Sequence, residues 1–121
     1  MIKGREPISM MHIRKVVSEH YGLSVDQICQ DSRAHCYARP RQVAMYFLRK
    51  LTRASLLQTA RFLGRKDHTT VRYAQRVVTN RMEEDSDFED DISYLQDKIL
   101  QPPLFHGVTR RQFIMKEINN D

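Results

Sequence analysis

The chain has 121 residues, of which 40% are apolar and 29% charged, and its formal net charge is +5. This length suits one domain that buries roughly two thirds of the surface its unfolded chain exposes. No apolar run approaches the ~20 residues of a membrane span, and the N-terminal MIKGREPISM lacks the apolar block of a secretory signal, so we expect a cytoplasmic protein whose two cysteines are reduced.

Two helices are expected in the first quarter of the chain. The first begins near Pro7, a favourable first-turn residue, and ends at Gly22. Its inward face is formed by Ile13, Val16, Val17 and either His20 or Tyr21. Ser24 and Gln27 have the spacing of a capping box, so a short second helix should start at Ser24 and stop by Asp31.

A polar, basic connection, DSRAHCYARP, then leads to a third helix. The connection has no apolar period, and its final Pro40 suits the first turn of a helix that runs to about Thr52. The buried stripe of this helix is Ala44, Phe47, Leu48 and Leu51. Its outward positions carry Arg41, Arg49, Lys50 and Arg53.

The next two helices have the pattern of a helix-turn-helix. Ser55 and Gln58 form a second capping-box pair, and Gly64 can close the helix that they open. After the turn RKD comes the segment HTTVRYAQRVV. The inward residues of the two helices are Leu56, Ala60, Leu63, Val71, Ala74, Val77 and Val78. An ordinary helical hairpin has the same pattern, so the pattern alone leaves both readings open.

A last helix is expected over residues 86–100. Its single apolar stripe is Phe88, Ile92, Leu95 and Ile99. QPP then breaks the chain, and residues 102–121 are interpreted as a tail that docks on the body or on a partner. The sequence therefore predicts an all-α fold: a compact helical domain of about six helices over residues 1–101, with its motif core at residues 38–82.

Charge is strongly partitioned along the chain. Twelve lysines and arginines but only one acid, Asp67, lie between Arg33 and Arg81, whereas residues 83–97 hold eight acids and no base. A basic body of this kind is typical of a protein that binds a polyanion. A merely solvated basic surface would look the same.

Asp67 precedes the fifth helix, where its side chain can accept a hydrogen bond from the amide of Thr69 or Thr70. In a recognition helix the same carboxylate can accept from the cytosine amino group in the major groove. His68 can donate to a purine, Thr69 can contact a thymine methyl, and Thr70 suits a phosphate. Further along the outward face, Arg72 and Arg76 can reach bases or backbone, although each of these residues also fits a plain surface position.

The stretch ARPRQVAMYFLRKLTRASLLQTARFLGRKDHTTVRYAQRVV resembles the C-terminal DNA-binding domain of the bacterial replication initiator DnaA. The similarity is carried by ARPRQ and DHTTV and extends more loosely over residues 10–101. It implies a helix-turn-helix of the Trp-repressor-like type that binds a short asymmetric duplex box as a monomer. A stand-alone sequence-specific DNA-binding protein is therefore expected, acting as a transcriptional regulator or as a competitor at replication origins.

The resemblance also implies roles for individual residues. Base reading in the major groove falls on Asp67, His68 and Thr69, and minor-groove reading falls on Arg33. Phosphate binding falls on Thr70, Gln42 and Arg49. Apart from the resemblance, phosphate binding is also expected from the basic residues Arg41, Arg65, Lys66, Arg72 and Arg76.

The chain departs from the family pattern in three ways. Arg65 replaces the second of two glycines that often precede the basic residue and the aspartate, and Leu57 replaces a proline. The chain also has no Gly-x4-Gly-Lys loop among its four glycines, so the ATPase of DnaA is not expected. No enzymatic activity, cofactor or metal is predicted.

Two alternatives belong to other functional classes. The acidic helix or the tail could recruit a protein partner, with only weak DNA binding. His20, Cys29, His35 and Cys36 could form a small metal or hydrolytic site, but they lack the CxxC or HxxxH spacing of paired ligands.

Overall fold

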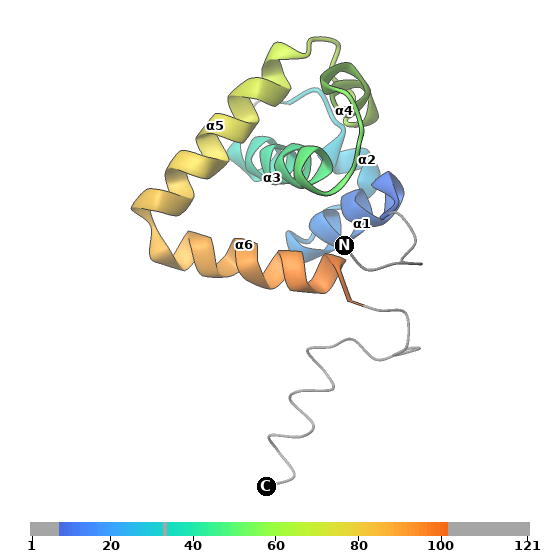
Figure 1. Ribbon diagram of the computed structural model, residues 1–121. Helices are drawn as coiled ribbons and strands as arrows, with labels where there is room; N and C mark the ends of the chain where they lie inside the picture. The colour runs from blue at the N-terminus through green and yellow to red at the C-terminus, as the bar shows by residue number, and fades with distance from the viewer. Residues whose placement is uncertain (1–7, 33, 102–121) are drawn as a thin grey trace, which may run out of the picture.

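The computed structural model describes residues 8–32 and 34–101, and all regular structure in these ranges is helical (Figure 1). The six helices are α1 (Met10–His20), α2 (Val25–Ile28), α3 (His35–Leu51), α4 (Leu56–Phe62), α5 (Thr69–Glu84) and α6 (Ser86–Ile99). The predicted all-α class with about six helices is confirmed. The expectations for Arg33 and for the tail fall outside the described residues.

Serine caps begin three of the helices. Ser24 and Ser55 each accept a hydrogen bond from the backbone amide of a glutamine three residues later, and that glutamine side chain accepts from the serine amide. Both predicted capping boxes are therefore confirmed. For α1 the predicted start near Pro7 was too early, because Ser9 is the N-cap and accepts from the His12 amide at 3.2 Å. Serine is the better cap because its side-chain oxygen accepts a hydrogen bond from a backbone amide in the first turn, and proline has no such oxygen.

Gly22 and Gly64 end α1 and α4, as predicted. Both have a positive φ, 71° and 76° respectively. Around Gly64 the amide donates to the Arg61 carbonyl at 3.0 Å, and the Arg65 amide donates to the Ala60 carbonyl at 2.8 Å. These two bonds define a Schellman motif, which requires the left-handed conformation that glycine adopts without strain.

The third helix begins at His35, so the predicted start at Pro40 was wrong. Its first turn forms when the amides of Tyr37 and Ala38 donate to the Ala34 carbonyl at 2.9 and 2.8 Å. Pro40 lies inside the helix and cannot donate to the carbonyl of Cys36. Cys36 is exposed, so water can supply the missing donor. The sequence pattern missed this turn because its outward residues carry no apolar period.

Helix α3 lies at the centre of the fold, with α5 along one side and α6 across one end (Figure 1). α3 packs against α1, α2, α4 and α5, and α6 packs against α1 and α5. The predicted inward stripe of α6, Phe88, Ile92, Leu95 and Ile99, is buried. Fully buried residues elsewhere in the fold include Ile13, Val17, Ile28, Ala44, Phe47, Leu48, Ala60, Leu63, Val71 and Ala74. This single core fixes α4 and α5 relative to α3.

Polar contacts tie α1 to α6. The His20 Nε2 atom lies 2.9 Å from Asp91 Oδ1, and the Tyr21 hydroxyl donates to Asp91 Oδ2 at 3.5 Å. Burial, and after it the negative charge of Asp91, raises the pKa of Tyr21 to about 12. The last helix is thereby joined to the first by a polar cluster as well as by its apolar stripe.

Candidate nucleic-acid interface

The start of α5 is organised by Asp67. Its Oδ1 atom accepts a hydrogen bond from the Thr69 amide at 2.9 Å, and its backbone carbonyl accepts from the Thr70 hydroxyl at 2.7 Å. The predicted capping bond is confirmed, although the N-cap position itself falls on His68, one residue later than expected. The Thr69 amide is the main cause that lowers the pKa of Asp67 below its ordinary value, so the carboxylate is ionised at neutral pH.

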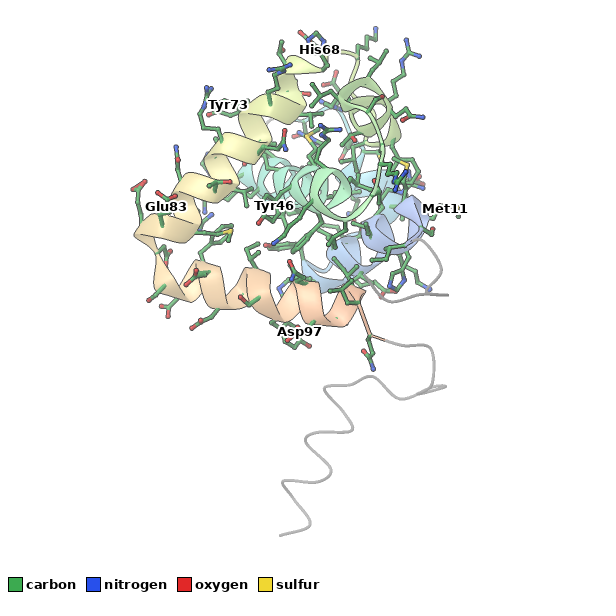
Figure 2. All side chains as sticks on the ribbon, viewed as in Figure 1. Met11, Tyr46, His68, Tyr73, Glu83 and Asp97 are labelled. Carbon is green, nitrogen blue, oxygen red and sulfur yellow. The ribbon has the colours of Figure 1, made fainter. Side chains whose placement is uncertain are left out.

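Asp67, His68 and Thr69 are exposed together at the first turn of α5. The side chains of Asp67 and His68 retain 62% and 55% of their exposure. In Figure 2, His68 lies at the tip of the molecule, where the turn enters α5. The three residues predicted to read bases therefore share one protruding end.

The outer face of α5 carries a basic and aromatic surface. Arg72, Tyr73 and Arg76 are all exposed, and Figure 2 shows Tyr73 on the outer side of the helix. The Arg76 guanidinium lies 5.7 Å from the centre of the Tyr73 ring, within cation–π range. Lys66 is exposed in the turn before α5.

A surface hollow brings together α3, α5, the turn between α4 and α5, and the α2–α3 connection. Its lining includes Gln42 from α3, Thr69, Thr70 and Tyr73 from α5, and Arg65 from the turn between α4 and α5. Several of the residues expected to bind phosphate or bases thus meet at one place.

Arg49 lies seven residues after Gln42, on the same face of α3 and two turns away. Its guanidinium donates to the Ala54 carbonyl at 2.5 Å, beside the start of α4. Arg49 therefore extends the face that Gln42 begins.

Arg41 does not lie on the surface, so its expected outward position was wrong. Only 6% of the residue is exposed. Its guanidinium donates to the carbonyls of Ile28 at 3.3 Å, Gln30 at 2.8 Å and Ser32 at 2.7 Å. Burial, and after it the charge of Arg65, lowers the pKa of Arg41 from its ordinary value. The charge of Arg41 holds the α2–α3 connection.

Comparison with known proteins identifies this helix-turn-helix. A family model described as the bacterial DnaA protein helix-turn-helix matches residues 10–78, more than half of the chain. The chain belongs to this DnaA helix-turn-helix family. The resemblance seen in the sequence is thereby confirmed, and a helix-turn-helix of this kind is a unit that binds double-stranded DNA.

Related full-length proteins are much longer than the matched segment. The chromosomal replication initiator protein DnaA of Gluconobacter oxydans is 39% identical over 89 residues, which cover 74% of this chain and 19% of that protein. DnaA of Chloroflexus aggregans is 38% identical over 95 residues, covering 78% of this chain and 20% of that protein. The chain spans about a fifth of the length of the curated relatives that it matches.

A solved structure shows the same fold. The crystal structure of a DNA replication initiation factor superimposes with a TM-score of 0.67 at 34% sequence identity. The match covers 74% of this chain and 27% of that chain. The DnaA-type helix-turn-helix is thus supported by sequence and by structure.

Two features of this DnaA-type domain were missed from the sequence. Tyr73 was not selected, although it follows Thr69 by four residues and precedes Arg76 by three, which places all three on one helical face. Asp31 was considered only as the end of a helix, yet it lines the hollow and lies 3.2 Å from the Arg65 guanidinium. A search of each helix for outward aromatic residues would have found Tyr73, whereas nothing in the sequence pairs Asp31 with Arg65.

The residues considered for a metal site do not gather into one. No group of three or more His, Cys, Asp or Glu residues suited to hold a metal ion occurs in residues 8–32 and 34–101. Cys29 and Cys36 are free thiols. Across the same ranges no helix is both long and apolar enough to cross a bilayer.

Proposed function

We propose that this DnaA-type domain binds double-stranded DNA sequence-specifically at sites that resemble DnaA boxes. The observation that carries the proposal is the shared exposure of Asp67, His68 and Thr69 at the first turn of a helix whose outer face is basic. The N-terminal residues of a recognition helix are those that meet base edges in the major groove. Asp67 would accept from cytosine, His68 would donate to a purine and Thr69 would contact a thymine methyl.

Phosphate binding is assigned to residues that flank this tip. Thr70 and Gln42 lie in the same hollow, and Arg49 extends the α3 face towards α4. Lys66, Arg72 and Arg76 supply exposed positive charge around the recognition helix. Such contacts fix the register and orientation of the protein but do not themselves select a sequence.

The distribution of charge favours one orientation on the duplex. Eight acids lie in residues 83–97, at the end of α5 and along α6. In Figure 2, Glu83 and Asp97 lie far from His68. The acidic helix would therefore point away from the negatively charged DNA while the helix-turn-helix faces it.

The minor-groove role of Arg33 remains part of the proposal. Arg33 falls outside the described residues, so its support is the resemblance to the DnaA family together with the position of Ser32, whose carbonyl is held by Arg41. We further propose that the domain acts as a monomer, as a transcriptional regulator or as a competitor at replication origins, without ATPase activity. The family match covers the DNA-binding segment of the relatives, and the chain contains no phosphate-binding Gly-x4-Gly-Lys sequence.

Selection of preferred sites from a random duplex pool tests this function. The recovered site and a scrambled duplex of the same composition are then compared at several salt concentrations. If about six phosphates are neutralised, log affinity should fall with log salt at a slope near −5. Equal affinity for the two duplexes at physiological salt would show that the domain has no sequence-specific function.

The tail is assigned a separate role. We propose that the domain ends near residue 101 and that residues 102–121 contact a protein partner. Deleting residues 102–121 should leave DNA affinity unchanged and remove the regulated response in cells. A large loss of DNA affinity after this deletion would place the tail in the DNA-binding unit instead.

A further inference from the structure

Two arginines from different elements converge on residues 29–32, which join α2 to α3. Arg41 reaches this segment from α3, as described above. Arg65 reaches it from the helix-turn-helix and donates through Nη2 to the carbonyls of Cys29 at 3.2 Å and Gln30 at 3.1 Å. The α2–α3 connection is therefore attached both to the central helix and to the turn that precedes α5.

Arg65 also faces the carboxylate of Asp31. Its Nη1 atom lies 3.2 Å from Asp31 Oδ1, with 15% of the Arg65 side chain exposed and 98% of the Asp31 side chain exposed. Asp31 lines the same hollow as Gln42 and Thr70, the proposed phosphate contacts. An uncompensated carboxylate at this place would repel a phosphate, and Arg65 neutralises it.

The turn and the connection are packed too closely for Arg65 to be a free surface arm. A Cβ atom on Gly64 would lie 2.5 Å from the Cys29 carbonyl oxygen, so the two backbones are in direct contact. The Arg65 Nε atom is buried without a hydrogen-bond partner, which shows that the guanidinium is enclosed where it meets the connection. An ion pair with an exposed partner adds little stability. The contacts of Arg65 therefore matter because they hold residues 29–31 against the turn.

We propose that Arg65 is a positioning residue for DNA recognition, which fixes residues 29–31 against the turn that begins the recognition helix and neutralises Asp31, and does not itself bind a phosphate. The inference rests on the proposed sequence-specific function. It replaces the phosphate contact expected for Arg65 from the sequence. In the free domain Nη2 already donates to two backbone carbonyls, and Nη1 donates to Asp31.

Lysine at this position separates the two roles. A lysine ammonium binds phosphate as a point charge, but it lacks the planar fork that meets Asp31 and two carbonyl groups from one position. Arg65→Lys should therefore preserve a phosphate contact and lose the positioning. A charge-balanced double variant, Arg65→Gln with Asp31→Asn, removes the pair without changing the net charge.

The experiment measures affinity for the selected duplex and for a scrambled duplex over a salt series. Wild type, Arg65→Lys, Asp31→Asn and the double variant are compared after thermal unfolding shows that each is folded. We expect Arg65→Lys to lower the ratio of the two affinities about tenfold, in the range for residues that act together. Asp31→Asn should keep the wild-type ratio, because the carbonyl contacts of Arg65 remain.

A second measurement follows hydrogen exchange in the α2–α3 connection of the DNA-free protein. The Gln30 amide donates to the Gln27 carbonyl at 3.2 Å, and the Ser32 amide donates to the Gln30 carbonyl at 2.9 Å. If Arg65 holds this segment, hydrogen exchange of these two amides should be faster in Arg65→Lys than in wild type. Unchanged exchange would overturn the positioning role.

Failure of the inference about Arg65 and failure of the proposed function give different results. A wild-type ratio in Arg65→Lys would mean that the fork does not position the site, and a salt slope about 0.9 shallower in the double variant would mean that Arg65 contacts a phosphate. Either result would overturn the inference alone. If wild-type protein does not discriminate between the duplexes, the proposed function fails and the inference fails with it. The predicted pattern is loss of discrimination at an unchanged salt slope.

Discussion

The Thr69 amide donates a 2.9 Å hydrogen bond to the Asp67 carboxylate, and both side chains are exposed at the same end of α5. The only acid in the basic stretch between Arg33 and Arg81 therefore starts the recognition helix. The carboxylate of Asp67 carries both the negative charge and the oxygen that caps the helix. The two contributions of Asp67 can be separated by substitution.

Asp67→Asn should keep the cap and change the DNA preference. Asparagine caps helices about as well as aspartate, but its side chain can donate as well as accept, so the preference for cytosine should weaken. Asp67→Ala should lower both the thermal midpoint and the affinity for the selected site. The measurements are thermal unfolding and repeated site selection. Recovery of the wild-type site by Asp67→Asn would assign Asp67 to capping alone.

Thr69→Ala should cost about 1 to 3 kcal/mol of binding free energy for the selected site and little for a scrambled duplex. Thr69→Val retains a methyl group and removes the hydroxyl, so it tests whether the thymine contact carries the effect. Arg49→Ala is the comparison, and it should weaken both duplexes alike. Because Arg49 also donates to the Ala54 carbonyl, its thermal midpoint is measured in parallel. Uniform losses in all three variants would argue against base reading.

The two helix-ending glycines provide a matched pair for stability. Both have positive φ, but a Cβ on Gly22 would meet nothing within 4 Å, whereas one on Gly64 would lie 2.5 Å from the Cys29 carbonyl oxygen. Gly22→Ala should cost about 1 kcal/mol of unfolding free energy, from backbone strain alone. Gly64→Ala should cost roughly 3 kcal/mol, because the backbones must also move apart. Equal losses in denaturant unfolding would show that the turn tolerates this shift.

The sequence predicted those features that depend on neighbours along the chain. The serine caps at Ser24 and Ser55, the glycine ends and the apolar stripe of α6 all have signals within one or two turns. The start of α3 and the inward course of Arg41 and Arg65 were not predicted. Their acceptors are backbone carbonyls of the α2–α3 connection, and a sequence pattern does not show which charged side chain turns towards a carbonyl.

The same limit applies to the candidate site. Asp67, His68 and Thr69 were predicted as a group because they are consecutive, and the structure exposes them together. The pairing of Asp31 with Arg65 joins residues 34 positions apart. Such a pair is visible only once the turn between α4 and α5 is packed against the α2–α3 connection.

The burial of Tyr21, together with its contact with Asp91, makes the unfolding free energy fall at alkaline pH. The folded-state pKa of Tyr21 is about 12, above its ordinary value of 10.0, mainly because of burial and then because of Asp91. A raised folded-state pKa means that the folded protein holds the phenolic proton more tightly than the unfolded chain does. The stabilisation is therefore complete below pH 10 and is lost as pH rises from 10 to about 12.

Tyr21→Phe removes the titrating group and should lose less unfolding free energy than wild type across this interval. Tyr73 is 53% exposed on the surface of α5, so Tyr73→Phe is the control and should follow wild type. Denaturant unfolding at pH 9, 10, 11 and 12 measures the difference, and parallel curves for wild type and Tyr21→Phe would show that folding does not raise the pKa of Tyr21.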